Sequence, residues 1–151
     1  MESTGLSGTG ETFIRSFKAL LDTNILTANT DADTQKHAAV VEFFAESDLH
    51  LSIAPHSIYE YWTVATRPRS VNGLSRSLED VWQDIAKLRS VFTVLPDPPE
   101  LLDTWLDLCR THEVSGKNAH DARLAAYAKC HGIDTLITLN ARDFARYGLN
   151  V

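Results

Sequence analysis

Apolar positions along the chain form two kinds of pattern, short continuous runs and longer stretches with helical spacing. The runs at 18–21, 49–53, 92–95 and 134–139 predict strands. Apolar residues recurring every three or four positions predict helices at 34–46, 57–66, 77–88, 101–109, 118–131 and 141–147. Because strands and helices alternate from beginning to end, we predict an α/β fold with a central parallel β-sheet flanked by α-helices.

Local signals define some of these elements further. Ser77 opens a Ser-x-x-Asp capping pattern, Pro68 limits the helix at 57–66, and Gly132 is typical of a helix C-terminus. The stretch 69–76 is polar and predicts a loop. The predicted buried faces of the first two helices comprise Ala38, Val41, Phe44 and Ala45, and then Ile58, Tyr61, Trp62 and Ala65.

The composition is typical of one soluble globular domain. The chain has 151 residues, 44% of them apolar, and its apolar runs are far shorter than the roughly 20 residues of a membrane helix. Residues 1–16 lack periodicity, so we expect a flexible N-terminal extension before a domain at 17–151. They also lack a signal-peptide pattern, and Cys109 and Cys130 are too few for a disulfide framework. We therefore expect a cytoplasmic protein without a membrane anchor.

Five polar residues occupy positions that suit a catalytic crevice. Asp22 closes the first strand, and in open α/β sheets ligands gather at the carboxyl ends of strands. Glu60 and Asp121 lie in predicted helices, and Asn140 and Asp143 follow the last strand. Each residue also has an ordinary alternative. Asp22 and Asp143 can cap helices, Glu60 can face solvent, Asp121 can interact with the helix dipole, and Asn140 can occupy a turn.

Taken together, these oxygen donors favour a divalent-cation site. Mg²⁺ takes oxygen ligands and is usually held by one or two carboxylates plus substrate phosphate, and Mn²⁺ is an alternative ion. Such an ion activates water and neutralises charge during in-line attack on a phosphodiester. The net charge is −6, but this does not exclude a nucleic-acid substrate, because a bound cation reverses the local charge.

Four sequence blocks carry a resemblance to a known family. They are LLDTNIL at 20–26, Glu60 within a helix, HDAxLAA at 120–126 and TxNxxDF at 138–144. In this order and spacing they resemble PIN-domain ribonucleases, and most of all the VapC toxins of bacterial toxin–antitoxin pairs. The resemblance extends over residues 17–151 and implies a PIN-like fold. It also implies a Mg²⁺-dependent endoribonuclease that cleaves RNA and is held in check by a cognate antitoxin protein.

The resemblance also assigns roles to individual residues. It implies that Asp22 and Asp121 are the principal metal ligands and that Glu60 assists through metal or water. The fourth, more variable position falls on Asn140, with Asp143 beside it in the loop. An amide there carries less charge for a second ion, so one ion or two are both compatible with the sequence. The residues that would orient Asp22 or water are Thr23, Asn24 and Thr138.

Further expectations concern substrate contacts and assembly. Arg67, Arg69 and Arg76 are candidate phosphate contacts, with a solvated loop as the alternative. Apolar surface at Tyr61, Trp62 and the helix at 77–88, together with the resemblance, predicts a homodimer. The alternative is that both aromatic side chains belong to the core. Two other functions stay open, a PIN-like RNA-binding module without catalysis and a metal-dependent phosphatase.

Overall fold

Four parallel strands form the centre of the molecule. In the computed structural model, which describes residues 18–151, they are β2 (Lys18–Leu21), β3 (His50–Ile53), β4 (Thr93–Val94) and β5 (Thr135–Ile137). The sheet order is β4-β3-β2-β5, and every pairing is parallel. The predicted α/β fold with a parallel sheet is confirmed. The expected extension at 1–16 and residue 17 lie outside the described residues.

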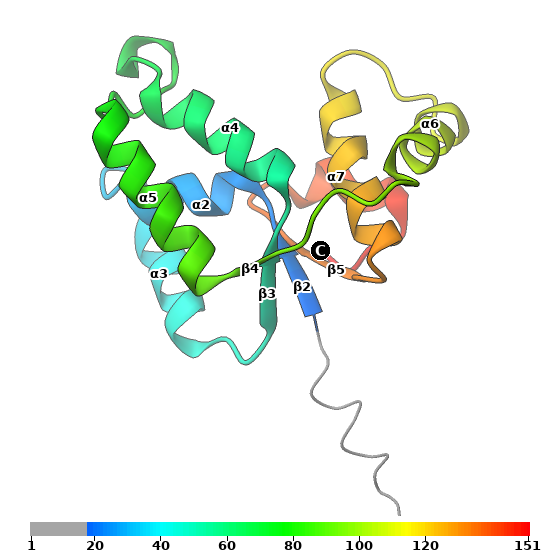
Figure 1. Cartoon of the computed structure of the whole chain (residues 1–151), viewed down its shortest axis with the longest axis horizontal. Helices are drawn as coiled ribbons and strands as arrows, with labels where there is room; N and C mark the ends of the chain where they lie inside the picture. Colours follow the sequence, from blue (N-terminus) through cyan, green and yellow to red (C-terminus); the bar gives the residue numbers. More distant parts are fainter. Residues whose placement is uncertain (1–17) are drawn as a thin grey trace, which may run out of the picture.

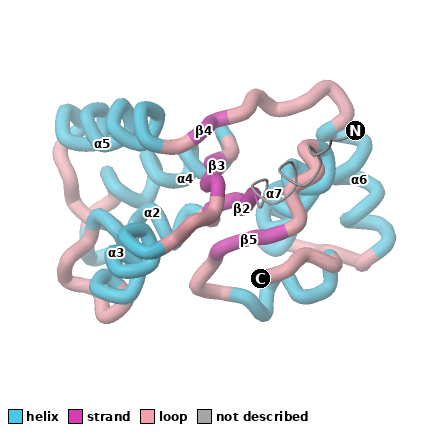
Figure 2. Tube along the Cα trace, turned by 90° about the horizontal axis from the view of Figure 1, so that it is seen from below, coloured by secondary structure: helices cyan, strands magenta, loops and turns pink. Residues whose placement is uncertain are grey.

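Helices cover both faces of this sheet, as Figures 1 and 2 show. On one side lie α2 (Thr23–Thr30), α3 (His37–Glu46), α4 (Pro55–Thr66) and α5 (Leu78–Val91). On the other lie α6 (Leu101–Thr111), α7 (Asn118–Cys130) and the 3₁₀ helix η2 (Ala141–Tyr147). A second 3₁₀ turn, η1 (Arg69–Val71), lies in the loop between α4 and α5.

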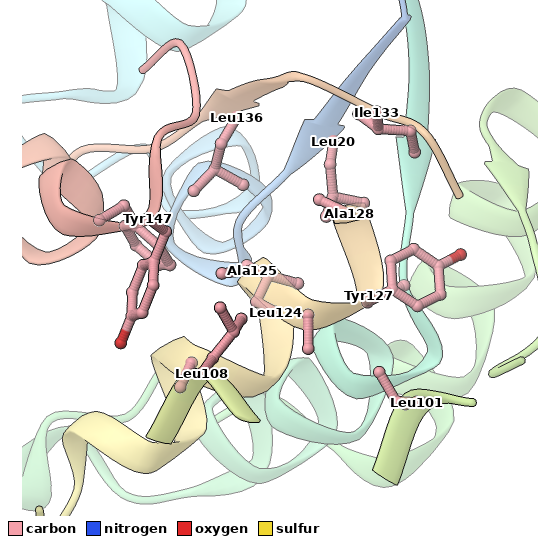
Figure 3. Packing of buried hydrophobic residues seen from close by; sticks show 14 residues of the cluster. Leu20, Leu101, Leu108, Leu124, Ala125, Tyr127, Ala128, Ile133, Leu136 and Tyr147 are labelled. Atoms are coloured by element: carbon pink, nitrogen blue, oxygen red, sulfur yellow. The ribbon is translucent and has the colours of Figure 1, made fainter. Parts of the chain in front are cut away.

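The sheet separates two hydrophobic cores because successive strand residues point to opposite faces. Leu20 and Leu136 pack into the cluster with α6 and α7 (Figure 3), whereas Leu21, Ile53 and Ile137 join the cluster with α2 to α5. Helix α7 buries a run of mostly small residues, Ala122, Leu124, Ala125, Ala126, Tyr127 and Ala128. Small side chains let this helix pack closely against α6 and η2, and that packing fixes the position of its N-terminal turn.

The structure corrects the predicted boundaries and faces of several helices. The helix expected at 34–46 begins only at His37, because residues 31–36 form turns after α2. Its buried residue is Val40, whereas Val41 is 43% exposed and Ala38 and Ala45 are exposed. Several adjacent apolar residues make the helical phase ambiguous from sequence. The helix expected at 57–66 begins at Pro55, which suits the first helical position.

Two predicted strands are shorter than expected, and the shorter β5 changes the position of a residue in the candidate site. The strand expected at 92–95 contains only Thr93 and Val94. The strand expected at 134–139 ends at Ile137, so Thr138 lies just beyond the sheet. Its hydroxyl is therefore placed at the end of the strand rather than within the sheet ladder. Between residues 18 and 151, no helix is long and apolar enough to cross a membrane.

The loop after α4 folds back tightly on the helix end. Gly73 N–H donates to the Pro68 carbonyl at 2.9 Å, and Ser75 N–H donates to the Arg67 carbonyl at 2.9 Å. Asn72 adopts a left-handed conformation with φ of 64°, and its carbonyl accepts a hydrogen bond from Arg67 Nη2 at 3.0 Å. A Cβ atom on Gly73 would overlap the Arg67 carbonyl, so only glycine fits this turn.

We predict that Gly73→Ala lowers the free energy of unfolding by about 1–3 kcal/mol, because the added methyl group forces the turn open. Chemical denaturation followed by circular dichroism measures this change. Ser70→Ala is the matched control, since Ser70 is exposed in the same turn. Equal stability of the two variants would contradict the steric argument.

Candidate active site

Asp22 lies at the junction between the sheet and the first helix on one face. Its backbone N–H donates to the Ile137 carbonyl at 2.9 Å and so extends the β2–β5 pairing by one residue. Its side chain caps α2, because Oδ1 accepts a hydrogen bond from Thr23 N–H at 2.7 Å. The residue is 9% exposed, and desolvation by burial raises the pKa of its carboxyl group despite two hydrogen bonds that lower it. The hydrogen bond by which Asp22 caps α2 therefore also holds its carboxylate in position at the candidate site.

Thr138 connects the end of β5 to this carboxylate. Its Oγ1 donates to Asp22 Oδ2 at 2.8 Å and accepts from Asn24 Nδ2 at 3.3 Å and from Asn140 N–H at 3.0 Å. Asn24 Oδ1 in turn accepts from Leu139 N–H at 3.1 Å. Thr138 thus binds Oδ2 of Asp22 and Thr23 N–H binds Oδ1, so residues at the ends of two neighbouring strands fix the orientation of this side chain.

Glu60 approaches Asp22 from α4. Thr23 Oγ1 donates to Glu60 Oε1 at 2.7 Å, and His56 Nε2 lies 3.4 Å from the same oxygen. The interaction with His56, helped by the Thr23 hydroxyl, holds the pKa of Glu60 below its ordinary value, although burial opposes the shift. Glu60 is therefore ionised at neutral pH, and Thr23 couples its position to the cap at Asp22.

A chain of hydrogen bonds extends from Glu60 to the far side of the site. Arg123 Nη1 lies 3.0 Å from His56 Nδ1, and Arg123 Nη2 donates to Asp97 Oδ2 at 2.9 Å. A guanidinium group can only donate, so His56 Nδ1 must accept and its Nε2 carries the proton toward Glu60. The ring of His120 stacks on that of His56, with centroids 6.3 Å apart. His56 is 8% exposed and so forms part of the floor of the site.

Asp121 projects from the first turn of α7, where the close packing of this helix positions it. Burial raises the pKa of its carboxyl group to about 6, and the negative charges of Asp22, Asp143 and Glu60 add to the shift. Several carboxylates thus crowd together with too little positive charge to balance them.

These side chains surround one open cavity of about 540 Å³. Its lining includes Asp22, Thr23, Asn24, His56, Tyr59, Glu60, Arg67, His120, Asp121, Arg123 and Asn140. A larger cavity of about 710 Å³ lies near β3, β4 and α5 and includes none of these residues. Its one carboxylate, Asp84, is paired with Arg76, so the smaller cavity carries the reactive chemistry.

The structure brings most of the predicted site residues together, but not all of them. Asn140 lines the cavity, whereas Asp143 is exposed and lies outside the lining. Asp143 N–H donates to the Asn140 carbonyl at 3.0 Å, and the carboxylate acts on Asp121 only through its charge.

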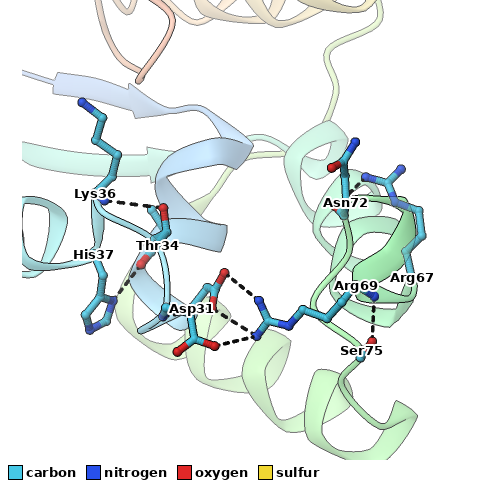
Figure 4. Close-up of polar contacts among 10 residues, drawn as sticks. Asp31, Thr34, Lys36, His37, Arg67, Arg69, Asn72 and Ser75 are labelled. Carbon is cyan, nitrogen blue, oxygen red and sulfur yellow. Dashed lines mark hydrogen bonds and ion pairs between the residues drawn. The ribbon is translucent and has the colours of Figure 1, made fainter.

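Of the three arginines proposed as phosphate contacts, only Arg67 lines the cavity. Arg69 makes an ion pair with Asp31 at 3.2 Å, as Figure 4 shows, and lies 3.5 Å from Asp33. Arg76 binds Asp84 through two hydrogen bonds of 2.7 Å. We therefore retain Arg67 alone as a candidate for contacting substrate phosphate.

Sequence reasoning missed His56, Tyr59 and Arg123 as members of the site. The separation of Glu60 from His56, four positions, puts both on one helix face and is a usable signal. Arg123 follows Asp121 by two positions, and residues at this spacing do not share a helix face, so the sequence does not indicate that Arg123 belongs to the site. Its place depends on Asp97, which is 26 residues away.

The residues present fit a divalent cation held by few protein ligands. Two carboxylates, Asp22 and Asp121, line one cavity, and burial together with the negative charge of neighbouring carboxylates raises the pKa of Asp121. Among residues 18–151, no group of three or more histidine, cysteine, aspartate or glutamate side chains is arranged to bind a metal ion by itself. Mg²⁺ suits this arrangement, because it keeps several waters and needs only one or two protein carboxylates.

Comparison with known families agrees with this geometry. The family model described as "PIN domain" matches residues 19–149. The chain belongs to the PIN-domain family. The family resemblance drawn from the four sequence blocks is confirmed.

Individual relatives of this PIN domain include named ribonucleases and toxins. Ribonuclease VapC24 of Mycobacterium tuberculosis is 26% identical over 138 residues, which cover 86% of this chain and 91% of that protein. The crystal structure of M. tuberculosis VapC20, described as a sarcin-ricin loop cleaving toxin, superposes with a TM-score of 0.68. Its identity is 21%, over 87% of this chain and 96% of that one. A toxin–antitoxin complex from Klebsiella pneumoniae matches with a TM-score of 0.57 and 22% identity, over 85% and 91% of the two chains.

The raised pKa of Asp121 predicts a specific dependence of stability on pH. Its pKa is about 6 in the folded PIN domain and near 3.8 in the unfolded chain, so folding favours the protonated form. The contribution of Asp121 to stability is therefore full below about pH 4 and is lost as the pH rises through 6. With chelator present, Asp121→Asn should melt at a higher temperature than wild type at about pH 8, with the difference vanishing near pH 4.

Thermal unfolding of both proteins across this pH range checks the prediction. Asp48→Asn is the control for the change of charge, because Asp48 is exposed. A melting difference between Asp121→Asn and wild type that does not change with pH would contradict the assigned pKa.

Proposed function

We propose that this PIN domain is a divalent-cation-dependent endoribonuclease and the toxin of a toxin–antitoxin pair. The observation that carries the proposal is the convergence of Asp22, Glu60 and Asp121 on one cavity from β2, α4 and α7. If each carboxylate only capped a helix or faced solvent, the three would not be expected to line the same cavity. Ribonuclease VapC24, which shares 26% identity over 138 residues, supports RNA as the substrate.

In this proposal Asp22 and Asp121 hold the cation, either Mg²⁺ or Mn²⁺. When bound, the cation would polarise the scissile phosphate and lower the pKa of a water molecule. The chain's own contribution is to keep Asp22 oriented, and Thr138 and Thr23 do this through hydrogen bonds of 2.8 and 2.7 Å. Asn140 completes the cavity with a neutral amide, and Asp143 adds negative charge from outside it.

Glu60 is assigned to accept the proton of the attacking water. The contacts from Thr23 and His56 both use Oε1, so Oε2 is the atom that we assign to the water. Glu60 is ionised at neutral pH and can therefore accept a proton, and its lowered pKa makes it a weak base. Arg67 lines the same cavity, and we assign it to contact a phosphate oxygen of the substrate.

We predict that Asp22→Asn abolishes most cation-dependent RNA cleavage while the fold is retained. Asparagine caps helices about as well as aspartate but carries no charge for the cation. Cleavage of total RNA in Mg²⁺, with and without chelator, measures the effect, and circular dichroism checks the fold. Asp48→Asn, the same chemical change at an exposed position, should cleave like wild type.

Unchanged cleavage by Asp22→Asn would reject the assignment of this residue. If the folded wild-type protein binds RNA but shows no cleavage with either cation, a PIN-like binding module is the better description. Cleavage of phosphate monoesters without cleavage of RNA would instead favour a phosphatase.

The antitoxin partner is proposed from the relatives and from the charge of the site. The similar chain from Klebsiella pneumoniae was solved in a toxin–antitoxin complex. An acidic cavity that holds a cation also accepts a basic side chain, and arginine pairs with carboxylates through two hydrogen bonds. We therefore propose that an antitoxin segment competes with the cation at Asp22, Glu60 and Asp121.

The proposed target, cellular RNA, agrees with the cytoplasmic location that we expect for this protein.

We also propose a homodimer, but in the structure Tyr61 no longer belongs to the surface that supports it. Tyr61 is fully buried, and its hydroxyl donates to Asp84 at 2.8 Å, so this residue belongs to the core. Trp62 and Trp82 are 36% and 67% exposed, and Leu78 is 63% exposed. These side chains supply exposed apolar area that a second subunit would cover.

We predict that expression of wild-type protein alone arrests bacterial growth, because an active ribonuclease without its inhibitor degrades cellular RNA. Growth after induction measures this effect, and Asp22→Asn at equal protein level is the inactive control. Normal growth in the presence of folded, active wild-type protein would reject the toxin assignment and leave the nuclease assignment intact.

A further inference from the structure

A second cavity, of about 550 Å³, lies directly beside the candidate active site. Its lining includes Pro98, Pro99, Leu102 and Trp105, together with His120 and Arg123. The last two residues also line the catalytic cavity, so the two spaces share one boundary. Anything bound across that boundary would extend from the carboxylates onto the surface formed by α6 and α7.

The walls of this second cavity are held in place by hydrogen bonds. Trp105 Nε1 donates to the Ala119 carbonyl at 2.8 Å, which ties the indole ring of α6 to the first turn of α7. Arg123 is fixed between His56 and Asp97 at 3.0 and 2.9 Å. Two consecutive prolines restrict the backbone on the remaining side. The walls of the cavity are therefore held by contacts within the chain itself.

The chemistry of the lining favours a flat, mostly apolar ligand. Among the described residues that line it, only His120 and Arg123 are basic, and both lie at the boundary with the catalytic cavity. Glu100 and Asp103 are exposed on the neighbouring surface and would repel a phosphate group there. Leu102 lines this cavity and is 62% exposed, so its side chain is free to contact a ligand there.

We propose that this second cavity binds a nucleobase of the RNA, next to the phosphate that is cleaved. This inference rests on the proposed ribonuclease function. A nucleobase has apolar faces and no charge, and unpaired RNA bases are commonly held by stacking on aromatic side chains. The shared boundary places the backbone phosphate at the carboxylates and the adjacent base against Trp105, Leu102 and the prolines. The base, rather than the phosphate, would then contribute to the choice of cleavage site.

The binding experiment measures the fluorescence of Trp105, which lies in the wall of the second cavity. Trp62→Phe and Trp82→Phe replace the other two tryptophans, both of which are partly exposed. In an Asp22→Asn background with Mg²⁺, the RNA is not consumed during the titration. The probes are hexamers of adenylate and of uridylate, and an abasic ribose-phosphate hexamer of the same length. We expect saturable quenching of Trp105 fluorescence by at least one base-containing hexamer and none by the abasic one.

Two leucines of α6 provide a matched pair of variants. Leu102 and Leu106 are four residues apart and are 62% and 50% exposed, but only Leu102 lines the cavity. Leu102→Ser should weaken binding of the hexamer about tenfold, a typical effect of losing one well-packed contact. Leu106→Ser should leave binding unchanged, and both variants should melt near the wild-type temperature.

Other results would overturn the proposal. Equal effects of the two variants, or quenching by the abasic hexamer as strong as by the others, would show that no base occupies the cavity. A change in molar mass caused by Leu102→Ser, with hexamer binding unchanged, would assign this surface to a protein partner. Cleavage of total RNA by wild type is measured separately, so a failed nuclease assignment is distinguished from a failed base site.

Discussion

The hydrogen bond from Thr138 Oγ1 to Asp22 Oδ2 is the interaction on which the candidate site depends. It joins residues 116 positions apart in the sequence, at the ends of β5 and β2. Burial alone would favour a neutral Asp22, and hydrogen bonds from Thr138 and Thr23 N–H favour the charged form. The parallel pairing of β2 with β5 brings Thr138 to this carboxylate, because the Asp22 N–H continues the ladder to the Ile137 carbonyl. The sheet therefore both builds the fold and orients the first acidic side chain.

The remaining acidic groups come from opposite sides of the sheet. Glu60 belongs to α4, which packs in the core with Leu21 and Ile53, and Asp121 belongs to α7, which packs in the core with Leu20 and Leu136. Burying Asp121 and bringing it near the other carboxylates costs stability at neutral pH, as the raised pKa of Asp121 shows. Two well-packed cores offset that cost. A cation site formed in this way is preorganised because neither helix can move without disturbing its core.

The sequence predicted the parts of this arrangement that depend on local pattern. The strand at 18–21, the cap at Ser77 and the helix ending before Gly132 all follow from neighbouring residues, and the structure contains each of them. Parallel strands also predict that Asp22 and the residues after β5 meet at one edge. Contacts between distant segments were not predictable in this way. The pairing of Arg76 with Asp84 and the chain from Asp97 through Arg123 to His56 depend on how helices dock.

The two walls of the site differ in chemistry, and this difference follows from the fold. The wall from α4 supplies Glu60, Arg67 and Tyr59, which suit a charged backbone and an attacking water. The other wall consists of α6, α7 and the two prolines just before α6, and beyond Arg123 it presents proline, leucine and tryptophan side chains. Helix α6 packs mainly on α7, so Leu101 and Leu108 are buried in the shared core, whereas Leu102 and Leu106 on its other face are exposed. Both sides of the sheet therefore provide acidic groups, and only the side of α6 and α7 adds an apolar surface beside them.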